Sequence, residues 1–245
     1  MLSIQNLRKS FGGVQALENC SFKVGEGKIT ALIGPNGSGK TTLFNIVSGL
    51  LKADSGKVFF QGKNITNKKP ERIARLGVSR LFQQSRLFEN LAVEENLLLA
   101  LNEDDEKFWK NALGLNNPGK EKHVKVKEIL KTVGLENVGK KLSRDLSFGQ
   151  KRLVELARAI AKPHSFLMLD EPIAGINPKL RVEIAKALKS LKKQGQTILL
   201  IEHDMSFTLG IADFVIVLDD GRVIAEGVPS KIRKNPKVLE AYLGE

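Results

Sequence analysis

One run of nine residues combines the residue types that bind phosphate groups. They are Gly34, Pro35, Asn36, Gly37, Ser38, Gly39, Lys40, Thr41 and Thr42, in the spacing G-x-x-x-x-G-K-[ST]. The glycines let successive backbone N–H groups turn inward and cradle a polyphosphate at a helix N-terminus. Lys40 supplies a mobile positive charge for the β- and γ-phosphates, and the Thr41 hydroxyl suits Mg²⁺ as a ligand. The run predicts a phosphate-binding loop.

The flanks of this loop supply the context that it needs. Ile29–Ile33 is an apolar, β-prone run that predicts a buried strand, and residues 42–47 have helical spacing of apolar residues. A glycine-rich turn that matches by chance is the alternative. Strand, glycine turn and helix in this order favour the phosphate-binding loop.

A second candidate site is a pair of carboxylates. Residues 166–169 predict a fully apolar strand, and Asp170 and Glu171 follow it directly. Two acids at such a strand end are costly unless a cation or a water uses them. We expect Asp170 to act on Mg²⁺, usually through water, and Glu171 to act on the water that attacks a γ-phosphate. A solvated turn is the alternative, but it leaves the apolar run and the acids as a coincidence.

Two further side chains lie where an α/β sheet contacts ligands, and a third lies in the N-terminal flap. Gln83 follows a strand predicted at residues 78–82, and His203 follows the strand predicted at Thr197–Ile201. His203 is placed to hydrogen-bond a γ-phosphate, although a lone histidine is more often structural. Phe11 is predicted in a loop beside two glycines, where an aromatic ring can stack on adenine.

The remaining chain predicts an α/β protein with an inserted helical lobe. Short strands at residues 1–7 and 20–24 indicate an antiparallel flap. Between residues 91 and 161 the pattern becomes helical and basic. The clearest predicted helices are Val93–Leu101, 122–133, 150–161 and Pro178–Lys193, and the later strands are 56–60, 214–218 and 222–225, followed by two short helices.

Composition indicates an ordinary globular chain of 245 residues, 42% hydrophobic and 27% charged. We expect no secretion signal and no membrane span, and the lone Cys20 to be a core residue in a reducing compartment. The net charge is +12, and twelve Lys or Arg lie between Lys107 and Arg152. This favours anionic partners, although a solvated helical face explains most of these lysines. No aromatic interleaving suggests base stacking, so no nucleic acid partner is expected.

The decisive motif is Leu146-Ser147-Phe148-Gly149-Gln150, which resembles the signature sequence of the ATP-binding cassette ATPases. The resemblance covers essentially the whole chain. It implies a P-loop NTPase (RecA-like) core with an N-terminal antiparallel β subdomain and an inserted α-helical subdomain. Residues 1–245 then form one domain, with the β subdomain and core at about 1–90 and 163–245, and the helical signature subdomain at about 91–162.

The resemblance also implies ATP and Mg²⁺ as ligands and a role for each motif. Catalysis falls to Glu171, His203, Lys40 and Gln83, and the metal ligands are Thr41, Gln83 and Asp170. The nucleotide contacts implied are Phe11, Ala16, the nine residues from Gly34 to Thr42, Gln83, Ser147, Phe148, Gly149, Gln150, Asp170 and His203. In this family two copies pack head to tail, so that Ser147 and Gly149 of one close over the γ-phosphate held by the other. Gly175–Asn177 is implied to be the loop that crosses this dimer.

Several stretches are similar to the ATPase subunits of branched-chain amino-acid importers. These are residues 10–17, 81–84 with 86–88, 174–178, 201–205 and 235–244. The resemblance implies a peripheral protein on the cytoplasmic face of the inner or plasma membrane. Its partners would be permease subunits, a second copy or a related ATPase, and indirectly a solute-binding protein. The chain departs from the broad family at Phe148, where Gly is frequent, at Asn177, where Asp is frequent, and at Phe11, where Tyr is frequent.

Four alternatives stay open from the sequence. A lipopolysaccharide or other lipid exporter ATPase and a urea or amide importer ATPase share most of these motifs. A cassette ATPase that acts on DNA or ribosomes usually needs a coiled-coil insertion or a second cassette, and neither is present. A regulatory protein that binds nucleotide without hydrolysis is opposed by the intact Lys40, Asp170, Glu171 and His203.

Overall fold

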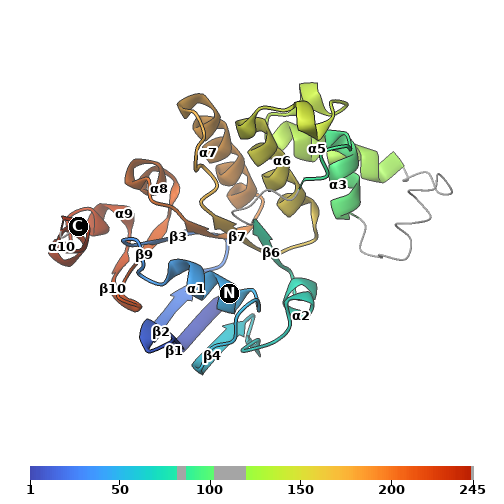
Figure 1. Cartoon of the computed structure of the whole chain (residues 1–245). Helices are drawn as coiled ribbons and strands as arrows, with labels where there is room; N and C mark the ends of the chain where they lie inside the picture. Colours follow the sequence, from blue (N-terminus) through green and yellow to red (C-terminus); the bar gives the residue numbers. More distant parts are fainter. Residues whose placement is uncertain (82–86, 102–119, 244–245) are drawn as a thin grey trace. The chain divides into compact units, whose positions relative to one another are not determined.

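The computed structural model describes residues 1–81, 87–101 and 120–243 (Figure 1). It contains two compact units. The first unit is Met1–Arg80, Ser165–Glu171 and Leu191–Glu245, and the second is Leu81–His164 and Pro172–Ser190. The division into core and helical subdomain near residues 91 and 162 stays a prediction.

The first unit is built on a mainly parallel sheet with the strand order β10-β9-β3-β8-β7-β6. The strands are β3 (Ile29–Ile33), β6 (Val78–Leu81), β7 (Phe166–Asp170), β8 (Thr197–Ile201), β9 (Phe214–Asp219) and β10 (Arg222–Gly227). β3 pairs in parallel with β8 and β9, and β7 pairs in parallel with β8. Every residue of β3, β7 and β8 is buried, as expected for parallel strands that are covered on both faces.

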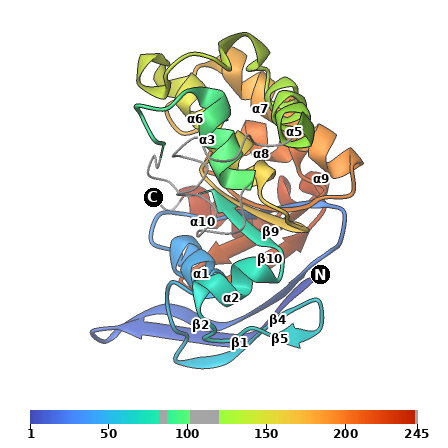
Figure 2. The same ribbon diagram turned by 90° about the vertical axis from the view of Figure 1, so that its right-hand side faces the viewer.

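An antiparallel sheet with the order β2-β1-β4-β5 forms the other layer of this unit (Figure 2). Its strands are β1 (Leu2–Phe11), β2 (Val14–Val24), β4 (Ser55–Phe60) and β5 (Lys63–Asn64). This confirms the predicted antiparallel flap.

The first two strands are longer than residues 1–7 and 20–24, and Phe11 ends β1 instead of lying in a loop. Phe11 pairs with Val14 across a two-glycine turn. The outer part of the hairpin is polar and lacks the alternation that marks a buried strand. It is held by backbone pairing and by Asp54, which accepts hydrogen bonds from Lys9 Nζ at 2.6 Å and Ser10 N at 2.7 Å.

The main core lies between the two sheets and includes the apolar face of α1 (Lys40–Val47). Leu43 and Phe44 of this helix are fully buried with Leu32 and Met168 of the parallel sheet. The opposite sheet face packs with α8 (Met205–Ile211), α9 (Pro229–Ile232) and α10 (Pro236–Leu243). α8 and α2 (Pro70–Arg75), of seven and six residues, were not predicted.

The second unit is helical, which agrees with the predicted lobe. It contains α3 (Val93–Leu101), α5 (Lys120–Thr132), α6 (Phe148–Ala161) and most of α7 (Pro178–Lys193), with short 3-10 turns at Glu136–Val138 and Ser143–Asp145. α3, α5 and α6 pack on one another. In the part of the chain that the structure describes, no helix combines the length and apolar character needed to cross a membrane.

Candidate active site

Three of the predicted motifs meet at one edge of the parallel sheet. β3 ends at Ile33 before the glycine loop, β7 ends at Asp170, and β8 ends at Ile201, two residues before His203. Because these strands run parallel, their carboxyl ends share one edge. The predicted phosphate loop, acids and histidine are thus brought together within the first unit.

The phosphate loop needs glycine at two positions of close backbone approach. Gly39 has a φ of +99° and is the N-cap of α1. A Cβ there would overlap the Ala16 carbonyl oxygen and lie 3.0 Å from Leu17 Cδ2. At Gly34, with a φ of +151°, a Cβ would overlap the carbonyl oxygen of Leu218. Both side-chain-free positions let the loop lie against β2 and β9.

Lys40 is a buried cation inside the loop that it follows. Its Nζ donates to the carbonyl oxygens of Gly34 at 2.8 Å and Pro35 at 2.6 Å, and lies 3.2 Å from Ser38 Oγ. These are neutral acceptors, so a phosphate oxygen is a stronger partner for the ammonium group. The lysine is therefore held where a phosphate bound by the loop would exchange for these carbonyls.

The turn between β9 and β10 supports the phosphate loop from outside, which the sequence did not reveal. Gly221 N donates to Ser38 O at 3.1 Å, and Gly221 O accepts from Glu18 N at 2.9 Å. The loop is thus tied to β2 and to the β9–β10 hairpin. Only the tertiary pairing of distant segments identifies this support.

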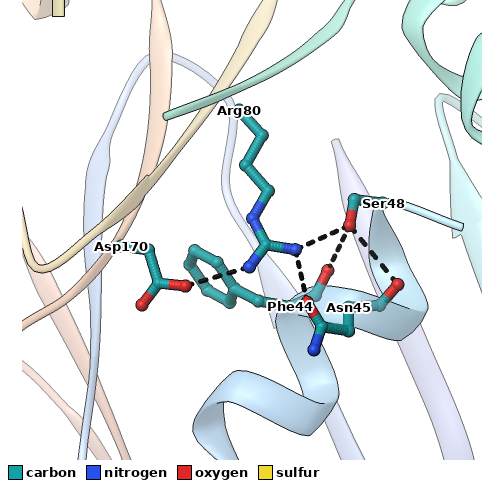
Figure 3. A network of polar contacts seen from close by, with 5 residues as sticks. All are labelled: Phe44, Asn45, Ser48, Arg80 and Asp170. Carbon is teal, nitrogen blue, oxygen red and sulfur yellow. Dashed lines mark hydrogen bonds and ion pairs between the residues drawn. The ribbon is translucent and has the colours of Figure 1, made fainter. Parts of the chain in front are cut away.

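Asp170 is buried and bound by an arginine from the neighbouring strand (Figure 3). Arg80 Nη2 donates to Asp170 Oδ2 at 2.9 Å, and Nη1 donates at 2.8 Å to both Asn45 Oδ1 and Ser48 Oγ. Arg80, Asn45 and Ser48 were not among the residues predicted for the site. One signal was available: Arg80 is a charged residue in an otherwise uncharged strand next to the acidic one.

Glu171 and His203 form a contact pair at the same edge. Oε1 of Glu171 and Nε2 of His203 are hydrogen-bonded. Glu171 adopts a φ of +48°, and its backbone N–H donates to Ile201 O at 3.0 Å. A non-glycine residue in this region costs roughly 1–3 kcal/mol and persists where its surroundings fix it. In this turn the Glu171 carboxylate contacts the histidine.

The residues after β8 fix the backbone that carries His203. Asp204 is the N-cap of α8 and accepts a hydrogen bond from Phe207 N at 2.9 Å. Glu202 is buried, and its Oε2 accepts from His203 N at 3.3 Å. His203 is therefore held between a buried acid and a capped helix.

Two of the three predicted metal ligands lie in the first unit. Thr41 is exposed in the first turn of α1, and Asp170 is the buried acid that ends β7. A hydroxyl and a carboxylate are oxygen donors of the kind that Mg²⁺ takes together with nucleotide phosphates. These two residues therefore fit the ion. Gln83 lies outside the described residues, as do Phe82 and residues 84–86.

The predicted adenine contacts lie on the β1–β2 hairpin. Phe11 is 48% exposed, and Lys9 Nζ lies 5.3 Å from its ring centroid. Ala16, on β2, contributes the carbonyl against which Gly39 packs. An exposed ring on the arm that adjoins the phosphate loop is available for stacking.

The signature residues belong to the second unit. Ser147 is the N-cap of α6, and its Oγ accepts from Gln150 N at 3.3 Å. Gln150 Oε1 in turn accepts from Ser147 N at 3.1 Å, which completes a capping box. This fixes the N-terminus of a fourteen-residue helix, an end that favours anions.

Phe148 links the signature to the loop at residues 174–177 within the same unit. Its ring is 66% exposed, and a Cβ on Gly175 would lie 3.1 Å from Phe148 Cε1. Asn177 Oδ1 accepts from Leu180 N at 3.0 Å, in the first turn of α7. The two departures from the broad family at Phe148 and Asn177 thus have local structural partners.

Comparison with known proteins decides the family. Residues 17–174 match the family model described as ABC transporter. The chain belongs to the ABC transporter family. Residues 222–245 match a second model, described as branched-chain amino acid ATP-binding cassette transporter.

The reported relatives of this ABC chain cover 94–100% of it. The probable branched-chain amino acid transport ATP-binding protein LivG of Archaeoglobus fulgidus is 44% identical, with 100% of this chain and 95% of the relative covered. A crystal structure of the ADP conformation of an ABC transporter cassette is 37% identical, with a TM-score of 0.87 over 100% and 99% of the two chains. A dimeric cassette in a post-hydrolysis state, bound to ADP and Pi, is 27% identical with a TM-score of 0.79 over 94% and 99%. The expected P-loop α/β fold and the nucleotide ligand are confirmed.

Proposed function

We propose that this chain is the ATP-hydrolysing subunit of an ABC importer for branched-chain amino acids. The observation that carries the ATPase activity is the convergence of Lys40, Asp170 and the Glu171–His203 pair at one sheet edge. Binding alone does not require a carboxylate oriented by a histidine. Hydrolysis does, because an attacking water must be positioned and deprotonated.

The chemical step transfers the γ-phosphoryl group of ATP to water. The water oxygen forms a bond to γ-phosphorus while the bond to the β–γ bridging oxygen breaks, which leaves ADP and phosphate. Glu171 accepts the water proton. Nε2 of His203 contacts that carboxylate, and a bound γ-phosphate would compete with Glu171 for the same N–H group. Lys40 and the loop N–H groups stabilise the charge on the phosphate oxygens. A magnesium ion held by Thr41 and Asp170 would neutralise charge on the β- and γ-phosphates.

We place this chain in a head-to-tail dimer. The signature serine caps α6 in the second unit, whereas Lys40 and Glu171 lie in the first. A phosphate bound at Lys40 of one copy would meet the helix N-terminus at Ser147 of another. The dimeric relative bound to ADP and Pi supports a dimeric state.

The transported class is proposed from the C-terminal segment and the relatives. Residues 222–245 match the branched-chain model, and the Archaeoglobus relative carries that assignment in its name. Neither feature favours the lipid exporter, the urea importer or a nucleic acid function. We propose that the chain lies peripherally on the cytoplasmic face of the membrane and drives permease subunits, either as a homodimer or with a related ATPase.

Two variants test the ATPase assignment. Glu171→Gln keeps the phosphate loop but removes the base, so it is expected to bind ATP and dimerise without turnover. Lys40→Met is the matched variant, because it removes the phosphate contact and is expected to lose ATP affinity. For both variants, phosphate release measures turnover and light scattering with MgATP measures dimerisation. Normal phosphate release by Glu171→Gln would remove Glu171 from the role of base.

A transport assay tests the substrate class. The chain is reconstituted with its permease subunits and solute-binding protein in proteoliposomes. Three quantities are then compared: uptake of labelled leucine, uptake of labelled urea, and movement of lipid between the leaflets. ATP-dependent leucine uptake that is absent with Glu171→Gln is expected. Uptake of urea alone, or lipid movement alone, would contradict the importer assignment while leaving the ATPase assignment intact.

A further inference from the structure

The guanidinium of Arg80 joins two parts of the nucleotide site that are far apart in sequence. It binds Asp170 at the end of β7 and Asn45 and Ser48 at the end of α1, with donor–acceptor distances of 2.8–2.9 Å (Figure 3). Ser48 is itself fixed, since its Oγ donates to Phe44 O at 2.8 Å. The arginine therefore forms a bridge between helix and strand.

This bridge is buried and electrostatically matched. The side chains of Arg80 and Asp170 are only 7% and 4% exposed. The cation lies at the C-terminal end of α1, where the helix dipole favours positive charge, and 5.6 Å from the ring centroid of Phe44. A buried guanidinium with acceptors on both sides has a fixed orientation, which it passes to the carboxylate that it binds.

We propose that Arg80 is a positioning residue that holds the Asp170 carboxylate in register with α1, so that Thr41 and Asp170 present their oxygens together to Mg²⁺. Thr41 lies in the first turn of α1, and Asn45 and Ser48 lie near the end of the same short helix. The inference rests on the proposed binding of ATP with magnesium. It adds a residue that acts on the metal site only through Asp170.

Two effects of Arg80 on the metal have opposite signs. Its positive charge repels a divalent cation, so loss of the charge alone would strengthen magnesium binding. Its hydrogen bonds orient Asp170, so loss of the bridge would weaken magnesium binding. Removing a partner that orients a metal ligand typically costs about 10- to 100-fold in metal affinity. We expect the orienting effect to exceed the repulsion.

The test measures binding of the non-hydrolysable analogue AMP-PNP by calorimetry, in EDTA and over a series of MgCl2 concentrations. Arg80→Met is expected to raise the Mg²⁺ concentration for half-maximal gain in affinity by at least about tenfold. Affinity in EDTA should stay within about twofold, because the phosphate loop is unchanged. Arg80→Lys keeps the charge without the fork and should give a smaller shift. Lys192→Met, which breaks a 2.8 Å ion pair with Asp213 in the same unit, is the matched control.

A double-mutant cycle separates positioning from a structural role. Arg80→Met in the Asp170→Asn background should add no shift beyond about twofold, because the residue through which it acts is already changed. Additive shifts, an unchanged or lower Mg²⁺ requirement in Arg80→Met, or equal losses with and without metal would each overturn the inference. If Arg80→Met fails to fold, the same cycle with Arg80→Lys decides. Absence of AMP-PNP binding by the unmodified chain would refute the proposed function instead.

Discussion

Replacing Gly39 by alanine tests whether the phosphate loop depends on close backbone packing. The residue has a φ of +99°, and its Cβ would overlap the Ala16 carbonyl and crowd Leu17. Gly37 is a matched control in the same loop, because its φ is +79° but a Cβ there has nothing within 4 Å. The two substitutions share the backbone strain and differ in the packing.

The expected magnitudes follow from these two terms. Left-handed backbone costs alanine about 1–2 kcal/mol, which applies to both variants. Overpacking adds about 1–3 kcal/mol for Gly39→Ala alone. A loss of 1 kcal/mol lowers the Tm of a chain of this size by about 2–4 °C. We expect Gly37→Ala to lose a few degrees and Gly39→Ala clearly more.

Thermal unfolding followed by far-UV circular dichroism without nucleotide measures the difference, and AMP-PNP titration measures the functional result. Gly39→Ala displaces the start of α1, because Leu43 N donates to Gly39 O at 2.9 Å, so nucleotide affinity should fall with stability. Equal Tm values for Gly37→Ala and Gly39→Ala would refute the packing argument. A stable Gly39→Ala that binds nucleotide normally would also show that the loop tolerates a Cβ.

Two further predictions concern the cap behind His203 and the acid stability of the chain. Asp204→Ala removes the cap of α8 and should lower the unfolding free energy by about 0.5–2 kcal/mol. It should also reduce the rate of phosphate release. Asp204→Asn retains a cap and should keep both the unfolding free energy and the rate near their original values. If Asp204→Ala changes neither quantity, the cap does not hold His203. Burial lowers the pKa of His164 from its ordinary 6.5, so the folded state binds fewer protons there than the unfolded state. This contribution to stability is present above pH 6.5 and is lost as the pH falls toward the lowered pKa. The drop in Tm below pH 6.5 should therefore be smaller in His164→Phe. An identical dependence of Tm on pH in the two proteins would contradict this prediction.

Local pattern was sufficient for most elements. β8 and α7 were predicted with the bounds that the structure has, because one is a continuous apolar run and the other has a helical period after proline. The outer hairpin of β1 and β2 and the short α8 were not. Their stability comes from partners such as Asp54 and from the Asp204 cap, which leave no periodic trace in the sequence.

Residue type, spacing and the preceding strands are enough to predict which residues carry phosphate chemistry: the glycine loop, Lys40 and the Asp170-Glu171 pair. The contacts that hold these residues in place come from segments that are distant in the chain. Arg80 and Asp170 are ninety residues apart in the chain, and they meet because β6 and β7 are neighbours in the sheet. A charge pair of this kind depends on strand order and burial. The local sequence around Arg80 or Asp170 shows neither the strand order nor the burial.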